Sequence, residues 1–410
     1  MTGTATAQLI SFAMMPIVSR LFTPADFGIF GSYTAVLGVL SAGVTLQYAQ
    51  AIVLPKHKEE GINLLFVAGL SAALVTAMVA IFVLLFPMAV QNLVNAPSGW
   101  FLPLLLIALL VNGLNQTFQA WCVRVKAFKP TSTSQVIRSI SAIGIWIAAG
   151  FGHMGALGLA LGAICADILA SLNLWRIVKH DMKENHAAVA WVRIKQLAHE
   201  FRDFPLFSAP QNIMNAISQG LPVLMLGYFY GIGVAGAYAF GLRIIHAPMG
   251  FLLTPLRQVL FQKASETHNQ GGNLYTLFIK TTGGLMAVAL VPCVVLFILS
   301  PQIFSWLFGV EWREAGVYAR WLLLWMFVLF SNVPSVLFAR ILRQQKNLFV
   351  FDCFVLLTRT SILAFGGFYW TALTTIIFFS VLGFILNVIL IGWIGTLLHF
   401  KNIKINISTV

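Results

Sequence analysis

The stretch GINLLFVAGLSAALVTAMVAIFVLLF, residues 61–86, contains no charged side chain and is long enough to cross a lipid bilayer as a helix. It opens a longer uncharged segment that runs from Gly61 to Val123. Residues that favour turns interrupt this segment between Gln91 and Gly99 and divide it into two apolar runs. Because one crossing needs about 20 residues, the segment predicts two membrane-spanning helices.

The same pattern extends along the rest of the chain. Other uncharged stretches cover residues 27–55, 139–166, 204–242 and 360–400. The first apolar run lacks a basic leader and a small-residue cleavage site, so we interpret it as a helix and not as a signal peptide. The sequence therefore predicts an all-α polytopic membrane protein with twelve transmembrane helices, at about residues 3–22, 28–54, 62–90, 101–123, 131–152, 154–178, 204–229, 234–258, 274–300, 315–340, 347–369 and 372–398.

The composition supports this class. Of the 410 residues, 59% are hydrophobic and 9% are charged, and the mean hydropathy is +0.88. These values exclude an ordinary soluble protein and a disordered chain. The four cysteines lie in apolar runs without the spacing of metal ligands, so we expect neither a disulfide framework nor a metal site, and no cofactor. The basic loops lack the composition of a nucleic-acid-binding domain, and we expect no nucleic-acid partner.

The basic residues predict the orientation in the membrane. Of the 25 Lys and Arg residues, 18 follow even-numbered predicted helices, whereas the loops after odd-numbered helices hold only Arg20, Arg313 and Arg320. Since cytoplasmic loops carry the excess of positive charge, both termini are predicted to be cytoplasmic. The 18 residues are Lys56, Lys58, Arg124, Lys126, Lys129, Arg176, Lys179, Lys183, Arg193, Lys195, Arg202, Arg257, Lys263, Arg340, Arg343, Lys346, Lys401 and Lys404.

A polar stretch divides the predicted helices six and six. We expect an N-terminal six-helix half at 1–178, a cytoplasmic linker at 179–203, a C-terminal six-helix half at 204–398 and a cytoplasmic tail at 399–410. Within the linker, Trp191, Ile194, Ala198 and Phe201 recur at helical spacing, which indicates an amphipathic helix on the cytoplasmic leaflet. The alternative is a solvated linker with incidental apolar residues.

The two halves share sequence landmarks. The turn Phe22–Gly28 after the first helix corresponds to Phe229–Gly236 after the seventh, and the basic segment 124–129 corresponds to 340–346. An even number of helices per half makes the repeats parallel, related by an axis along the membrane normal. Such pseudo-symmetric halves around a central cavity are typical of alternating-access transporters.

Charged residues inside the predicted helices mark candidate sites, because each costs about 2.5–3.5 kcal/mol at a helix centre. Four positive against two negative side chains leave a positive surplus that suits an anion, which arginine binds bidentately, so the candidates for substrate binding are Arg138, Arg359 and Arg243. Asp167 is a candidate coupling residue or ion-pair partner, and Lys280 lies near enough to a helix end to snorkel. The full set is Arg138, Arg243, Lys280, Arg359, Asp167 and Asp352.

Two of these arginines stand at matched positions in the repeats. Arg138 follows Lys126 at nearly the distance at which Arg359 follows Lys346. We therefore expect the two arginines to face each other across the pseudo-two-fold axis.

Two motifs carry a family resemblance. The segment RLFTPADFG at 20–28 resembles the turn after the first helix in bacterial Wzx-type polysaccharide and O-antigen flippases of the multidrug/oligosaccharidyl-lipid/polysaccharide exporter superfamily. The segment FGVEWREAG at 308–316 is similar to the loop before the tenth helix in the same proteins. The first motif also has a structural explanation, in which Thr23 caps the second helix and Pro24 occupies its first position.

The resemblance implies a function. A flippase of this kind moves an undecaprenyl-diphosphate-linked glycan, such as an O-antigen unit of lipopolysaccharide, from the cytoplasmic to the periplasmic leaflet of the bacterial inner membrane by alternating access. Its partners would then be the lipid-linked glycan, membrane lipids and polysaccharide-assembly proteins.

Other function classes remain as alternatives. One is a cation-coupled multidrug exporter of the same superfamily, for which Asp167 is the one deep carboxylate of the first half. Another is a membrane polysaccharide polymerase or ligase, which would need larger outer loops than those predicted here. No catalytic constellation occurs in the polar segments, so we expect a protein that is not an enzyme.

Overall fold

The computed structural model of the chain describes residues 2–86, 99–184, 189–270, 272–342 and 344–408. Parts of the sequence prediction fall outside these residues: the end of the third predicted helix at 87–90, the turn at 91–98, residues 185–188 of the linker, Arg343 of the second basic segment, and residues 409–410 of the tail.

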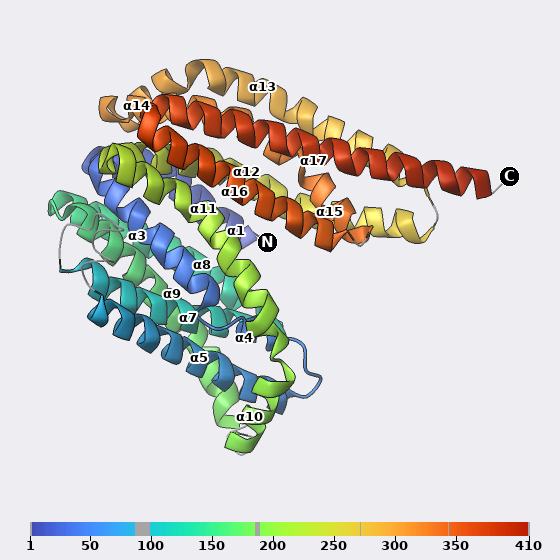
Figure 1. Ribbon diagram of the computed structural model, residues 1–410. Coiled ribbons are helices and arrows are strands. Elements are labelled where there is room, and N and C mark those ends of the chain that lie inside the picture. The colour runs from blue at the N-terminus through green and yellow to red at the C-terminus, as the bar shows by residue number, and fades with distance from the viewer. Residues whose placement is uncertain (1, 87–98, 185–188, 271, 343, 409–410) are drawn as a thin grey trace. The chain divides into compact units, whose positions relative to one another are not determined.

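Within the described residues, all regular elements are helices, and they run in chain order as Figure 1 shows. Short π and 3-10 turns, Phe204–Ser208 and Val310–Trp312, precede α11 and α14. The α-helices are α1 (Thr2–Ala13), α2 (Met15–Leu21), α3 (Pro24–Gly43), α4 (Tyr48–Ala51), α5 (Lys58–Leu85), α7 (Phe101–Arg124), α8 (Phe128–Phe151), α9 (Gly155–Glu184), α10 (Trp191–Glu200), α11 (Ala209–Tyr230), α12 (Ile232–Asn269), α13 (Leu274–Phe308), α14 (Arg313–Ser331), α15 (Val333–Ile341), α16 (Gln345–Tyr369) and α17 (Ala372–Ser408).

The predicted fold class is confirmed. Each of the twelve predicted membrane segments coincides with a helix or with a consecutive helix pair, namely α1 with α2, α3 with α4, and α14 with α15. In the described part of the chain, ten helical segments are long and apolar enough to cross a membrane. The chain is thus a multi-pass membrane protein.

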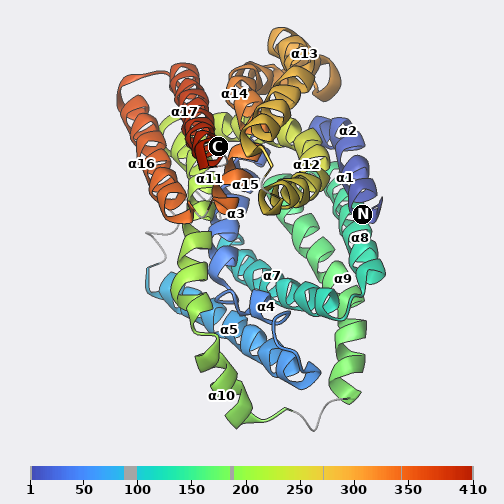
Figure 2. The same cartoon turned by 90° about the vertical axis from the view of Figure 1, so that its right-hand side faces the viewer.

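The chain forms two compact units, Met1–Gly236 and Ala237–Val410. In the first unit α8 packs against α9, α7 against α5 and α9, and α3 against α11, as Figures 1 and 2 show. In the second unit α14 packs against α13 and α17, and α16 packs against α17. The first unit thus includes α11, while the predicted six-and-six division at residues 179–203 stays a prediction.

Small residues explain why α11 joins the first unit. A Cβ at Gly43 of α3 would lie 2.8 Å from Ile213 Cδ1 of α11, and a Cβ at Gly220 of α11 would lie 3.3 Å from the Cβ of Ala35. Small residues at these points let the two helix backbones approach closely. In a membrane, where the hydrophobic effect does not drive helices together, such close packing contributes van der Waals energy to their association.

The turn before α3 is fixed by a capping box. The Thr23 backbone N–H donates to Asp26 Oδ2 (2.9 Å), and the Asp26 N–H donates to Thr23 Oγ1 (3.2 Å). The second carboxylate oxygen of Asp26 accepts from the Ala156 N–H at the start of α9 (3.1 Å). The predicted capping role of Thr23 is confirmed, and Asp26 also ties α3 to α9.

The two turns that match in the sequence repeats touch each other inside the first unit. A Cβ at Gly28 would collide with the carbonyl oxygen of Ile232, and a Cβ at Gly236 would collide with the carbonyl oxygen of Pro24. Glycine at both positions therefore lets the starts of α3 and α12 pack backbone against backbone.

The predicted linker helix exists as α10. Its apolar residues Ile194 and Leu197 are buried in a cluster with Tyr48 and Trp121, whereas Trp191 is exposed. The Tyr48 hydroxyl donates to the Ala198 carbonyl (2.8 Å), and Arg193 Nη2 lies 2.9 Å from Glu60 Oε1. The inner face of α10 thus packs on the protein and not in lipid.

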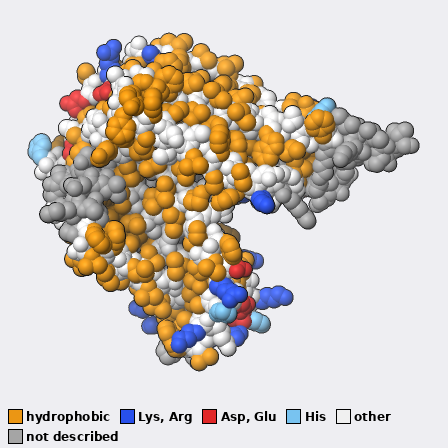
Figure 3. Space-filling model, viewed as in Figure 1, with side chains coloured by type: hydrophobic (Ala, Val, Ile, Leu, Met, Phe, Trp, Pro, Cys, Tyr) orange, Lys and Arg blue, Asp and Glu red, His pale blue; other side chains and the backbone are white. Residues whose placement is uncertain are grey.

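The outer surface of the first unit is that of a membrane protein. Figure 3 shows hydrophobic side chains covering the flanks of the helices, with charged side chains gathered near α10. Leu74, Met78 and Leu85 of α5 are among the exposed large apolar residues. Because a soluble protein rarely exposes so continuous an apolar surface, this face is suited to contact with lipid.

Candidate functional site

Two of the predicted site residues lie together in the first unit. Arg138 on α8 places Nε 2.5 Å from Oδ1 of Asp167 on the neighbouring helix α9. The Asp167 side chain is only 11% exposed, whereas the Arg138 side chain is 47% exposed. Asp167 therefore orients the inner end of the guanidinium, and part of the arginine stays open to a ligand.

A chain of hydrogen bonds extends this ion pair to α7. The Ser171 hydroxyl donates to the Asp167 carbonyl (2.7 Å) and accepts from Asn115 Nδ2 (2.7 Å). Gln119 Nε2 in turn donates to Asn115 Oδ1. These bonds hold α7 and α9 together through uncharged groups, so the first unit has a polar interior around the ion pair.

A second group of side-chain amides donates hydrogen bonds where the second predicted transmembrane helix is interrupted. Between α3 and α4 the backbone adopts positive φ at Leu46 (48°) and Gln47 (62°). Gln47 Nε2 donates to the Ala42 carbonyl (2.6 Å), and Gln116 Nε2 donates to the Ser41 carbonyl (3.0 Å). Side-chain amides thus replace backbone donors that the interrupted helix lacks, as a membrane interior requires.

This amide group was not among the candidate residues predicted from the sequence. Asn112, Asn115, Gln116 and Gln119 are spaced three and four residues apart on α7, which places them along one side of a helix. The spacing is visible in the sequence, but a search confined to charged residues passes over it.

Arg359 lies in the second unit, in an aromatic clamp. Its Cζ atom is 3.9 Å from the centre of the Trp325 ring and 4.0 Å from the centre of the Phe379 ring. Trp325 belongs to α14 and Phe379 to α17, and both rings contact Arg359 of α16. Cation–π contacts of this kind stabilise a guanidinium that has left water.

Two nitrogen atoms of the Arg359 guanidinium lack a hydrogen-bond acceptor. Nε and Nη2 of Arg359 are buried and have no hydrogen-bond partner among the described residues. A buried donor without an acceptor costs about 1–3 kcal/mol, and more for a charged group. The clamp therefore orients the Arg359 guanidinium, and its free N–H groups can donate to an anion.

The remaining charged candidates are Arg243, Lys280 and Asp352. Arg243 lies on α12 in the second unit and is exposed. Lys280 lies in the second turn of α13 and is also exposed, as expected for a lysine that snorkels to the interface. Asp352 is exposed on α16. The structure brings Arg138 and Asp167 together, while the pairing of Arg138 with Arg359 stays a prediction.

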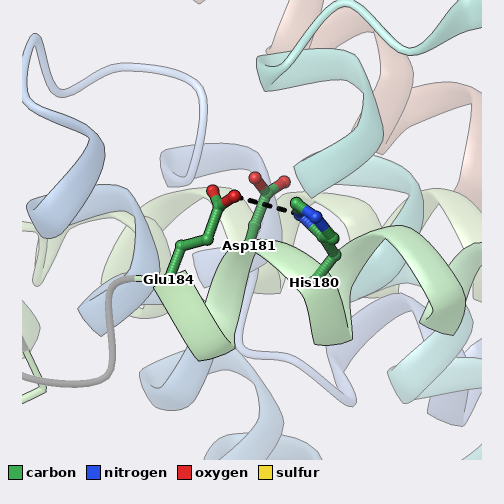
Figure 4. A group of neighbouring side chains, drawn as sticks. All are labelled: His180, Asp181 and Glu184. Carbon is green, nitrogen blue, oxygen red and sulfur yellow. Dashed lines mark ion pairs between the residues drawn. The ribbon is translucent and has the colours of Figure 1, made fainter.

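One cluster within the described residues has the side-chain types of a metal site. Figure 4 shows His180, Asp181 and Glu184 on one face of α9. Lys58 Nζ lies 2.7 Å from Asp181 Oδ1 and 3.8 Å from Glu184 Oε2, and Trp121 Nε1 donates to Asp181 Oδ2 (2.9 Å). Because lysine and tryptophan occupy the carboxylate oxygens, the cluster ties α9 to α5 and α7.

Comparisons with known proteins place the chain in a family. The model of a family described as polysaccharide biosynthesis protein matches residues 17–317. The succinoglycan biosynthesis transport protein ExoT of Rhizobium meliloti (strain 1021) is 24% identical over 321 residues. That match covers 75% of this chain and 60% of the relative, so the chain spans less than two thirds of the relative's length.

Solved structures share the fold. The lipid II flippase MurJ in an inward closed conformation has a TM-score of 0.75 and 17% identity, with 95% of this chain and 86% of that chain covered. An outward-facing multidrug resistance transporter of the MATE family in the MOP superfamily has a TM-score of 0.61 and 13% identity, with 98% and 95% covered. At these identities the likeness shows the fold alone.

Proposed function

The chain belongs to the polysaccharide biosynthesis protein family, and from this premise we propose that it flips an undecaprenyl-diphosphate-linked oligosaccharide across the bacterial inner membrane. The direction is from the cytoplasmic to the periplasmic leaflet, by alternating access. An O-antigen unit or a similar repeat is the substrate class, and both termini lie in the cytoplasm, in keeping with the bias of basic loop residues.

The observation that carries this proposal is the unsatisfied edge of Arg359. Its guanidinium carbon lies against the rings of Trp325 and Phe379, which meet edge to face, and Nε and Nη2 have no partner among the described residues. A diphosphate oxygen brought by the substrate would accept from these donors and offset the cost of burying them. Because both nitrogens are buried in this structure, the proposal requires the side chain to move during transport so that the anion reaches them.

Arg138 has the complementary role in the first unit. Its ion pair with Asp167 fixes the guanidinium, and its exposed part can contact the same anionic group at another stage of transport. Arg243, which is exposed on α12, is a third candidate contact. Arginine suits this task because its planar fork binds phosphate oxygens in pairs.

The membrane potential supports the outward direction. An inside-negative potential favours the outward movement of two negative charges by roughly 4–5 kcal/mol per 100 mV. Export therefore does not need a carboxylate that carries protons. In the multidrug-exporter alternative, Asp167 would be that carboxylate, but its close pairing with Arg138 favours a positioning role.

A complementation experiment tests the function. A strain that lacks its own flippase receives the wild type, Arg359→Ala, Arg359→Lys or Arg138→Ala, and surface polysaccharide is normalised to inserted protein. We expect each alanine variant to lose at least about tenfold in activity per molecule, and lysine to restore only part of it.

A matched control is Arg320→Ala. Arg320 is also an arginine in a helix of the second unit whose buried Nε has no hydrogen-bond partner among the described residues, but its Nη2 donates to the Ile298 carbonyl (3.0 Å) within the fold. This variant should lower the amount of inserted protein and leave the activity per molecule near normal. If Arg359→Ala behaves in the same way as this control, Arg359 is structural and the proposed anion contact is wrong.

A further inference from the structure

Helix α11 carries a polar face that the charged candidates do not explain. Gln211, Asn215 and Gln219 follow one another at four-residue spacing, and all three are exposed. Asn212 and Ser218 flank them. At about 100° per residue these five side chains fall within roughly a third of the helix circumference.

The opposite face of α11 is the one that packs. Ile213 and Gly220 contact α3, and at the same 100° per residue they lie on the other side of the helix from the amides. The packing face and the polar face are therefore distinct. The amides do not serve the contact between α11 and α3.

The side chains of Gln211, Asn215 and Gln219 make no hydrogen bond to another described residue. Pro222 lies inside the helix and has no N–H, so the carbonyl of Ser218 loses its helical donor on the same face. The amides on α7, by contrast, bond to Ser171, Ser41 or each other.

The polarity of this face is unusual for a membrane segment. α11 occupies the seventh predicted span but is not among the ten helical segments of the described chain that are apolar enough to cross a membrane unaided. Lipid offers no hydrogen bonds, so exposed amides at this depth require water or a polar ligand. The face bears no charge, which makes it unsuited to an anion.

We propose that Gln211, Asn215 and Gln219 bind the sugar hydroxyls of the transported substrate as it crosses the membrane. This inference rests on the proposed flippase function and assigns the glycan part of the substrate to α11, apart from the arginines that contact the diphosphate. The ligand class is a neutral, hydroxyl-rich saccharide.

The chemistry of amides fits this ligand. Each amide donates and accepts, as each sugar hydroxyl does, so the pairing holds for many hydroxyl orientations. The steps between the three amides are about 6 Å along the helix axis, which offers successive contacts to a moving chain of sugar rings. Neutral hydrogen bonds are weak enough to exchange with water, so they solvate the glycan without trapping it.

The first test measures whether water reaches the polar face of α11. Cys122, Cys165, Cys293 and Cys353 are replaced by Ala, and Asn215→Cys or Val288→Cys is added to this background. Val288 is an exposed apolar residue of α13 and serves as the lipid-facing control. A membrane-impermeant maleimide is applied to spheroplasts and to inside-out vesicles. We expect labelling at position 215 from at least one side and none at 288. Absence of labelling at 215 from both sides overturns the inference.

The second test separates the glycan from the diphosphate. Proteoliposomes of phosphatidylethanolamine and phosphatidylglycerol contain radiolabelled polyprenyl diphosphate, either bare or carrying a neutral disaccharide. The fraction of each probe that an external pyrophosphatase cleaves is followed over time. The variant Gln211→Leu, Asn215→Leu, Gln219→Leu should move the disaccharide probe about five- to tenfold more slowly and the bare probe at the wild-type rate.

A matched variant keeps the amides and changes only their reach. Gln211→Asn, Asn215→Gln, Gln219→Asn should retain most transport of the disaccharide probe. If the leucine variant slows both probes equally, or slows neither, α11 does not bind the glycan and the inference is wrong, whereas the flippase function stands. If the wild type moves neither probe, the proposed function fails and the inference fails with it.

Discussion

Arg138 and Asp167 form an ion pair that joins two neighbouring membrane helices, with Nε 2.5 Å from Oδ1. The carboxylate is largely buried, and the Ser171 hydroxyl donates to the backbone carbonyl of Asp167. The pair therefore belongs to a polar network, and its role can be tested by removing the negative charge alone.

We predict that Asp167→Asn retains transport. Asparagine keeps an oxygen that accepts from Arg138 Nε, so the guanidinium stays oriented although the ion pair is lost. The free energy of unfolding should fall by about 1 kcal/mol, because Arg138 is half exposed. Surface polysaccharide per inserted molecule is the measurement. A variant that inserts normally but has no transport would show that Asp167 carries a coupling ion.

The close approach of α3 and α12 gives a second prediction. Gly236→Ala places a methyl group against the Pro24 carbonyl and 2.6 Å from the Gly28 nitrogen. Backbone atoms cannot move away from the added methyl group, whereas the end of a flexible side chain could. We therefore expect a loss of roughly 1–3 kcal/mol in stability and less inserted protein. Thermal unfolding in detergent measures this loss.

Gly233→Ala is the matched control for that variant. Gly233 lies three residues earlier on the same helix, and a Cβ there would meet no atom within 4 Å. The control should unfold at the wild-type temperature. Equal unfolding temperatures for the two variants would contradict the backbone contact at Gly236.

The sequence predicted the helices well for a physical reason. A bilayer excludes charge, so uncharged runs such as 61–86 reveal their role without knowledge of the fold. The capping of α3 was also predictable, because Thr23 and Asp26 act within one turn. Features of this kind depend only on residues that are close in the sequence, so they can be predicted from it.

The rest depends on residues far apart in the chain. Trp325 and Phe379 enclose Arg359 only after three helices have packed, and the sequence contains no local sign of this clamp. Likewise, Leu46 and Gln47 adopt positive φ although neither is glycine, so the break after α3 has no marker at those positions. The interfacial helix was predicted, but its packing on Tyr48 and Trp121 was not.

The packing of α10 leads to a third prediction. Leu197 is 1% exposed in the cluster with Tyr48 and Trp121, whereas Val192 on the same helix is 69% exposed. Leu197→Asp buries a charge and should sharply reduce inserted protein, while Val192→Asp should be tolerated. Immunoblotting of membrane fractions provides the comparison. Loss of protein with Val192→Asp alone would mean that lipid, and not α5, holds α10.

Orientation is the fourth prediction. A periplasm-active reporter fused after Lys404 should be inactive, because 18 of the 25 basic residues assign that side to the cytoplasm. The same reporter inserted after Gly309, in the turn between α13 and α14, should be active. The reverse pattern of activities would overturn the predicted topology and the direction of transport.

The last prediction concerns the aromatic clamp of Arg359. Trp325 has the stronger π face of the two rings, and its removal should free the guanidinium to adopt other rotamers. We expect Trp325→Phe to retain most transport, because a ring of the same orientation still covers one side. Trp325→Leu should keep the apolar packing but lose the cation–π contact, which is worth about 2 kcal/mol in a desolvated site.

The readout distinguishes positioning from folding. If Trp325 acts by orienting Arg359, Trp325→Leu should lower activity per inserted molecule, and adding Trp325→Leu to Arg359→Ala should cause little further loss. If Trp325 serves packing alone, the two changes should act independently, because the arginine would keep its contact with the anion. Additive losses in the double variant would therefore argue against the clamp as the device that presents Arg359 to the diphosphate.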